Sequence, residues 1–540
     1  MTLPIYKNKT LLLFSLCLAQ FAISADIASF SIATSSLMSH FQADGNDLKI
    51  AGAINPLIGA SFMLICSMVG LFIGWRRLLI FGFFTSTLSV VTILLAPSIN
   101  FIIYLARPLS GLGSASILPA ALALVIGHYP KEKRAVVFGA MAAATGIAAA
   151  ISPLVSGWLF DSYGWRSGFF LQLSFFVVGL FCAIFWISPL HNVKPKKFDT
   201  LGSILCATSL VLIVCALLLT PNWGLITNSS NLDLPPFFGS ISPALFMLIF
   251  GLIIFALFLL HEQKFERKYG VALLPVSWLR ERELQKGLAI LLVMYCIFGG
   301  FNFSIIAYLQ IAADLSAIKT GAIILVFAIA MIISSALTPI LLKEQQPKKL
   351  CALGFALFFF GGCFLGISTS EEGISALIYL AMAICGIGIG ILSSQTPVII
   401  TLAVGEKGAA QSGGIQATTR KIGLALGIAV VAGSGQSTLE NHVRERIIDN
   451  EHVSQPIQTL VSEAKAIPYI NDFMVIDFLN ELGVDESEIN HILEINNDSR
   501  NLNFTTSNRA MLIFAVLGVL ISLRLSRSKG KEPTEAQPAH

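Results

Sequence analysis

Fourteen apolar runs, each long enough to cross a bilayer, constrain this chain more than any other feature. A spanning helix needs ~20 apolar residues. Backbone groups in lipid must be satisfied within the segment, and the runs lack the alternation of barrel strands, so each run predicts a helix. The expected spans are 10–35, 50–73, 78–97, 100–126, 135–160, 167–189, 200–220, 241–261, 288–311, 319–342, 350–368, 374–402, 411–434 and 509–525. The sequence therefore predicts an all-α polytopic membrane protein with 14 transmembrane helices.

Composition supports this fold class and excludes several functions. The 540 residues are 55% hydrophobic and 12% charged, whereas soluble domains have about 25% charged residues. The nine cysteines lie in or beside apolar runs without a CxxC pattern, so neither disulfides nor a metal site is indicated. No nucleophile–base pair points to an enzyme, and nothing indicates a nucleic-acid partner.

Basic residues gather on alternate connections. If the connections are assigned to alternate sides from the N-terminus, 24 of the 35 Lys and Arg residues fall on one side. Connections rich in Lys and Arg stay in the cytoplasm. We therefore expect both termini to be cytoplasmic.

The loop at 436–508 is acidic, with thirteen Asp and Glu residues against four Lys and Arg. Apolar spacing at Phe473, Ile476, Leu479 and Leu482, together with a capping pattern at Asp485, predicts two or three short amphipathic helices over the outer face. One interpretation is a solvated cap. The other is a docking surface for a periplasmic adaptor.

Asp26 is the only carboxylate that lies well inside an expected span. Arg107 lies at a matching depth in the fourth span, at 1.5 Å of rise per residue. Ionisable residues inside a membrane are costly and are functional candidates. A movable Asp26–Arg107 pair could take up and release a proton. The alternative is a static ion pair that only fixes packing.

Two further groups of residues stand out in the spans. Small residues and a proline at Gly146, Ser152, Pro153 and Gly157 allow close helix approach and a bend in the fifth span. Isolated polar or aromatic groups could line a cargo cavity or form interhelical hydrogen bonds. These candidates are Asn55, Gln172, Tyr295, Asn302, Gln395 and Gln416, with Gln20 beside them.

Several of these segments resemble one family. LARPLSGLGSASILPA resembles the helix-four motif of the major facilitator superfamily, and GIAAAISPLVSGWLFDSYGWRSGFF resembles the helix-five antiporter motif. Asp26, FDTLGSIL, AYLQ and GAAQSGGIQATTRKIGLALGIAV are similar to the fourteen-helix drug:proton antiporter branch. The resemblance covers residues 10 to 434. It implies that Asp26 holds the coupling proton and Arg107 tunes it, and that Arg420 favours anionic cargo or pairs across the cavity.

The resemblance also implies a domain organisation. We expect an N-terminal six-helix bundle over 1–199, two inserted helices over 200–261 and the first five helices of a C-terminal bundle over 262–434. The acidic periplasmic loop follows over 435–508, and the last helix with a basic tail occupies 509–540.

The loop after the second span departs from the family pattern. SMVGLFIGWRR keeps Gly74, Arg76 and Arg77 but lacks the usual Asp and the preceding Arg. In the first span Ser31 and Ser35 replace the usual Asn and Pro. These departures put the charge latch of this loop in doubt and suggest a specialised substrate.

The leading hypothesis is a proton-coupled exporter of a drug or secreted metabolite in the inner membrane of a bacterium. Its partners would be cargo, protons and lipid, without a bound cofactor. Within transport, the alternative is a dedicated exporter of one metabolite such as a siderophore. A non-transporting scaffold or sensor is the alternative of another class.

Overall fold

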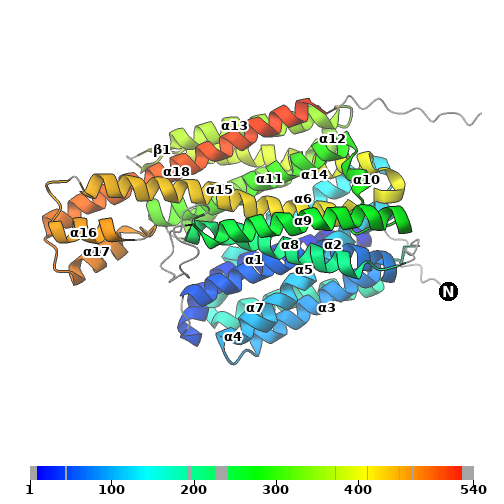
Figure 1. The fold of residues 1–540 in the computed structure, drawn as a ribbon, viewed down its shortest axis with the longest axis horizontal. Coiled ribbons are helices and arrows are strands. Elements are labelled where there is room, and N and C mark those ends of the chain that lie inside the picture. Colours follow the sequence, from blue (N-terminus) through cyan, green and yellow to red (C-terminus); the bar gives the residue numbers. More distant parts are fainter. Residues whose placement is uncertain are drawn as a thin grey trace, which may run out of the picture.

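The computed structural model describes residues 9–42, 45–190, 197–224, 241–315, 317–370, 373–409, 412–448, 450–464 and 467–525. Within these ranges 14 helical segments are long and apolar enough to cross a membrane. Figure 1 shows them running side by side along the long axis of the molecule. The expected all-α fold with 14 transmembrane helices is confirmed.

The first half of the bundle contains six spans. Its elements are α1 (Lys9–Phe41), α2 (Gly45–Ile73), α3 (Trp75–Leu94), α4 (Ile99–Phe101), the π-helical η2 (Ile102–Ala106), α5 (Arg107–His128), α6 (Lys131–Tyr163) and α7 (Trp165–Phe185). The short α4 and η2 run directly into α5, so these three elements form one span.

Two inserted spans and a second set of six follow. Their elements are α8 (Thr200–Trp223), α9 (Pro243–Tyr269), α10 (Val276–Leu279), α11 (Arg282–Ala307), the π-helical η4 (Tyr308–Ala312), α12 (Ala317–Leu341), α13 (Pro347–Ser368), α14 (Leu377–Ala409), α15 (Ser412–Ile448), α16 (Gln455–Glu463), α17 (Asp472–Glu481) and α18 (Glu486–Leu523). Strands β1 (Thr369–Ser370) and β2 (Gly373–Ile374) pair antiparallel between α13 and α14.

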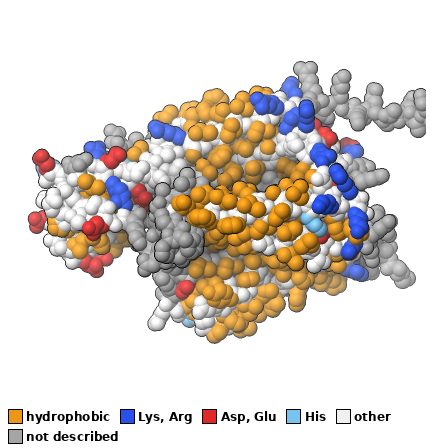
Figure 2. All heavy atoms as spheres, viewed as in Figure 1, with side chains coloured by type: hydrophobic (Ala, Val, Ile, Leu, Met, Phe, Trp, Pro, Cys, Tyr) orange, Lys and Arg blue, Asp and Glu red, His pale blue; other side chains and the backbone are white. Residues whose placement is uncertain are grey.

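Each half has its own apolar core. Trp75, Phe83 and Phe176 are buried in the first half, and Phe301 and Phe355 are buried in the second. Large side chains that point outward form the apolar surface visible in Figure 2. Lipid tails are as apolar as these side chains, so the outward-facing surface gives no hydrophobic driving force for helix association. The helices of each half are held together by the side chains that pack inside it.

The bundle has two chemically different ends. Lys and Arg gather at the end opposite the acidic residues of the 436–508 segment (Figure 2), and we call this end the basic end. Arg77, Lys131 and Lys349 lie in the first turns of α3, α6 and α13. The inserted helices pack through α8 against α2 and α15, with α9 outside them on α8.

The 436–508 segment forms a helical cap with its own apolar core. Leu439, Val443, Val475, Leu479 and Ile492 pack together there. Helices α16 and α17 are short, as expected, but the segment after Asp485 is the start of α18 and not a separate short helix. No proline interrupts α18 and its one glycine is Gly518, so the helix continues from the cap into the bundle (Figure 1).

Candidate functional site

Asp26 of α1 lies in a buried pocket against α2 and α5, with 4% of the side chain exposed. Its Oδ2 accepts hydrogen bonds from Ser110 Oγ at 2.6 Å and from Asn55 Nδ2 at 3.2 Å. Arg107 Nη1 lies 3.6 Å from the same oxygen. The matching depths of Asp26 and Arg107 therefore place them in one pocket. Whether this pair carries protons stays a prediction.

Arg107 is held independently of Asp26. Its Nε donates to Ala51 O at 2.9 Å, and its guanidinium lies 3.9 Å from the centre of the Phe30 ring. The π-helical turn of η2 ends directly before Arg107, and such turns occur often at functional sites. The guanidinium of Arg107 is therefore held in position beside the Asp26 carboxylate by contacts that do not involve Asp26.

Ser110 was missed in the sequence. It lies one turn after Arg107 on α5, so both side chains reach the same face of the helix. This i, i+3 spacing was the available signal. Asn55 was expected to line a cargo cavity or to form an interhelical hydrogen bond, and its amide on α2 donates to Asp26 on α1.

Lys421 approaches the pocket from the second half. It is 7% exposed, and the charges of Asp26 and Arg107 both act on it. A Cβ built on Gly59 would lie 3.8 Å from Lys421 Cε and 2.9 Å from Ser114 Oγ, so the glycine leaves room for the lysine between α2 and α5. The resemblance favoured Arg420 over this neighbour, because the family pattern has an Arg at that position.

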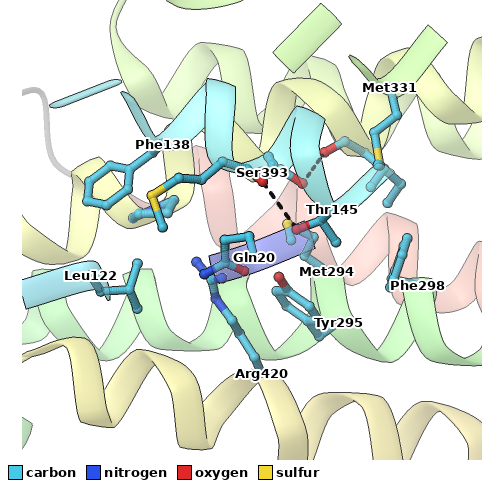
Figure 3. Close-up of a pocket in the computed structure, with 14 residues that line it drawn as sticks. Gln20, Leu122, Phe138, Thr145, Met294, Tyr295, Phe298, Met331, Ser393 and Arg420 are labelled. Carbon is cyan, nitrogen blue, oxygen red and sulfur yellow. Dashed lines mark hydrogen bonds between the residues drawn. The ribbon is translucent and has the colours of Figure 1, made fainter. Parts of the chain in front are cut away.

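Arg420 points into a central cavity between the two halves. Its guanidinium carbon lies 5.4 Å from the centre of the Tyr295 ring. Figure 3 shows both residues beside Gln20. The free space is about 50 Å³. The cavity is lined by Gln20, Leu122, Phe138, Met141, Ala142, Thr145, Met294, Tyr295, Phe298, Met331, Ile389, Ser393, Pro397 and Arg420.

The hydroxyl groups of Thr145 and Ser393 in this cavity already have hydrogen-bond partners. Thr145 and Ser393 donate to the carbonyl oxygens of Met141 and Ile389 on their own helices (Figure 3). Arg420 thus provides the charge in the described lining, and aromatic and methionine side chains provide most of the remaining contact surface. This chemistry suits a planar or anionic organic molecule.

The other cargo candidates lie outside this cavity. Gln172 donates to Ala22 O and joins α7 to α1. Gln395 and Gln416 donate to Ser394 and Ser412. Asn302 donates to Phe298 O and lines a second cavity of about 1180 Å³ between the inserted helices, α11, α15 and the cap.

The small residues of α6 face α12 at the interface between the halves. A Cβ at Gly146 would lie 2.5 Å from Met331 Cε, and one at Gly139 would lie 2.3 Å from Ser335 O. Ser152 is buried, and its Oγ has no hydrogen-bond partner among the described residues. Gly157 lies near Ile32, and the side chain of Pro153 is outside the described part.

The loop after α2 contacts its own half. Gly74 has a φ of 97°, which an L side chain rarely adopts, and it precedes α3. Arg76 donates to Ala183 O at 3.3 Å and also to Ile184 O at the end of α7. A cation there stabilises the negative end of the helix dipole. Arg77 is exposed in the first turn of α3.

Comparison with known proteins places this architecture in a family. Residues 16–428 match the family model of the Major Facilitator Superfamily. The multidrug resistance protein Stp of Mycobacterium tuberculosis is 25% identical over 448 residues, which are 82% of this chain and 80% of that protein. A probable actinorhodin transporter of Streptomyces coelicolor is 23% identical over 71% of this chain and 62% of its own length.

The fold leads to the same family. A solved bacterial homologue of the human drug peptide transporters PepT1 and PepT2 superposes with a TM-score of 0.54. It is 14% identical, with 95% of this chain and 98% of that one covered, so it shows the fold alone. The chain belongs to the major facilitator superfamily and is a many-span membrane transporter.

Proposed function

We propose that this transporter exports a small organic molecule in exchange for protons, with Asp26 as the proton carrier. The observation that carries the proposal is the buried approach of the Asp26 carboxylate to Arg107, with Lys421 buried near enough for its charge to interact with both. Asp26 and Arg107 come from the first half and Lys421 from the second. A change in the charge of Asp26 therefore changes the attraction between the two halves.

The cavity beside Arg420 supports organic cargo. Arg420 and Gln20 offer polar contacts, and Tyr295, Phe298 and Met331 offer apolar and aromatic surface. Relatives named for multidrug resistance and for actinorhodin support the same class of cargo. Arg420 favours anionic or polarised aromatic molecules because its guanidinium pairs with acidic groups and stacks on rings.

The second candidate is a dedicated exporter of one secreted metabolite, such as a siderophore. The substitutions at Ser31 and Ser35 after Asp26, and those in the loop after the second span, favour it over broad drug efflux. For both candidates we propose a bacterial inner membrane and cytoplasmic termini. The 24 basic residues on one side support this orientation.

The test uses the full chain in proteoliposomes with an imposed pH gradient and a fluorescent organic cation or anion as cargo. Asp26→Asn should abolish gradient-driven transport while cargo binding persists, because the amide keeps the shape and cannot titrate. Glu481→Gln, at an exposed position of the cap, is the matched control because it also replaces a carboxylate by an amide, and it should transport at the wild-type rate. Gradient-driven transport by Asp26→Asn at the wild-type rate would remove Asp26 from proton coupling.

A further inference from the structure

Two carboxyl groups and an imidazole meet at the basic end of the inserted helices. Asp199 caps the N-terminus of α8, and its Oδ1 accepts from Gly202 N at 2.8 Å. His261 Nε2 of α9 lies 2.9 Å from Asp199 Oδ1 and 3.0 Å from Oδ2. Glu262 follows on α9 and is 0% exposed, while Asp199 is 2% exposed. The sequence placed Glu262 just beyond its span, but α9 continues to Tyr269 and buries it.

The carboxyl group of Glu262 lies beside that of Asp199, and in the described part of the chain no hydrogen-bond donor bridges the two. Its Oε2 accepts from Leu274 N at 3.3 Å, while its buried Oε1 has no hydrogen-bond partner among the described residues. A Cβ built on Gly202 would lie 2.4 Å from Glu262 Oε1 and 2.5 Å from Asp199 Oδ2. The two oxygens are therefore no farther apart than the sum of these distances. Ionised carboxylates only accept hydrogen bonds and repel each other, so a proton on one of them would stabilise this approach.

The surroundings offer few other charges. Cys206 of α8 lies close enough for the charge of Glu262 to act on its thiol. The helices α2 and α15 contribute Leu64, Met68 and Ile415, which cannot titrate. Beyond the pair, the Nζ atoms of Lys197 and Lys268 lie over the Tyr269 ring, 5.5 and 5.4 Å from its centre. His261, at 25% exposed, connects the pair to solvent.

The position of the pair links the inserted helices to the interface between the halves. Leu64 and Ile415 belong to the apolar cluster that also contains Leu273 and Leu274. Close by, a Cβ on Gly414 of α15 would lie 2.4 Å from Ser67 Cβ of α2, so the two halves touch there. Repulsion between two ionised carboxylates would loosen α9 and the 271–275 segment from this contact.

We propose that Asp199 and Glu262 share one proton and form a second proton-binding site, separate from Asp26. The bound proton holds α8, α9 and the 271–275 segment together on α2 and α15. As the pH rises and the proton leaves, this packing weakens. The inference concerns protonation alone and does not depend on the proposed export function.

Infrared spectroscopy of the full chain in lipid nanodiscs tests the shared proton directly. In an Asp26→Asn background, a protonated-carboxyl band should be present at neutral pH and should disappear on alkalinisation. The band should be lost in Glu262→Gln and in Asp199→Asn. Both amides retain an acceptor and supply a permanent N–H donor, and Asn is also a good N-cap. Glu481→Gln, on the surface of the cap, is the matched control and should keep the band.

A stability measurement gives an independent readout. In a His261→Gln background, the parent should become less stable, by about tenfold per pH unit in the folding equilibrium, between about pH 4, where carboxyl groups of the unfolded chain titrate, and the pH at which the folded protein releases the shared proton. In that range the folded state holds one proton more than the unfolded state, and above it the dependence should level off. Glu262→Gln should show no such shift in that range. Absence of the band in the parent, its persistence in both amide variants, or a stability that follows added Na⁺ or Mg²⁺ and not pH would overturn the proposal.

Discussion

Asp26 Oδ2 and Arg107 Nη1 lie 3.6 Å apart, beyond direct hydrogen-bond distance, although both side chains are buried. Nη1 has no hydrogen-bond partner in the part of the chain that the structure describes. The guanidinium is held instead by Ala51 O and the Phe30 ring. The pair is therefore coupled by charge and not locked by a hydrogen bond. Asp26 can therefore change its charge while Arg107 keeps its contacts with Ala51 O and the Phe30 ring.

Arg107→Lys should reduce gradient-driven transport by about tenfold or more, because one hydrogen bond to a charged donor contributes about 1.5–3 kcal/mol. An ammonium cannot both donate to Ala51 O and lie flat on Phe30. Transport in proteoliposomes measures the effect. Arg77→Lys, at an exposed position, should behave as wild type. Equal transport by Arg107→Lys would show that only the positive charge matters.

Two glycines of α6 should respond differently to the same substitution. Gly139→Ala places a methyl group against the backbone oxygen of Ser335, which cannot move without shifting α12. Gly146→Ala meets the flexible end of Met331, which can move away. We expect Gly139→Ala to lower the melting temperature and transport, with Gly146→Ala close to wild type. Equal melting temperatures would mean that the α6–α12 contact adjusts freely.

Arg420 should discriminate cargo by charge. Arg420→Gln should weaken binding of an anionic dye by about tenfold, since a charged hydrogen bond contributes about 1.5–3 kcal/mol. Binding of the neutral ester of the same dye should change little. Arg420→Lys should retain part of the preference because it keeps the charge but loses the flat contact with Tyr295. Equal losses for acid and ester would indicate a packing role.

The orientation of the chain can be tested by cysteine labelling in a background without the nine native thiols. Ser487→Cys, at the start of α18 in the cap, should react with an impermeant reagent from outside. Ser229→Cys, outside the described residues, should behave in the same way. Ser528→Cys, also outside them, should react only after permeabilisation. Labelling of Ser528→Cys in intact cells would show that the C-terminus lies outside and would contradict the proposed topology.

The spans were predictable because a bilayer imposes a minimum apolar length, and the depth of Asp26 and Arg107 followed from the helical rise. The side chains that surround Asp26 were harder to predict from the sequence. Ser110 resembles any other serine in a small-residue helix, and the direction of Lys421 depends on the space that Gly59 leaves on a different helix. Glu262 was placed outside a span because a run ends at the first charges, whereas a helix continues until its backbone is capped. Here that cap is Gly270 with a φ of 75°.

Tyr469 gives the cap a predicted sensitivity to alkaline pH. Burial raises the pKa of Tyr469 above its ordinary value, although the charge of Arg500 partly opposes this effect. Arg500 also donates to Ile470 O at 3.3 Å, to Ile311 O at 3.1 Å and to Asp472 at 2.6 Å, so this corner of the cap is fastened to the bundle.

In the unfolded state Tyr469 titrates near pH 10, while in the folded cap it keeps its proton to higher pH. The stabilisation is therefore complete below about pH 10 and is lost as the pH rises further, at about tenfold per pH unit in the cap-opening equilibrium. Loss of helical circular dichroism and tyrosinate absorbance measure it. Tyr469→Phe should remove the dependence, and Tyr163→Phe, at an exposed position, should retain it. An unchanged alkaline transition in Tyr469→Phe would assign it to another group.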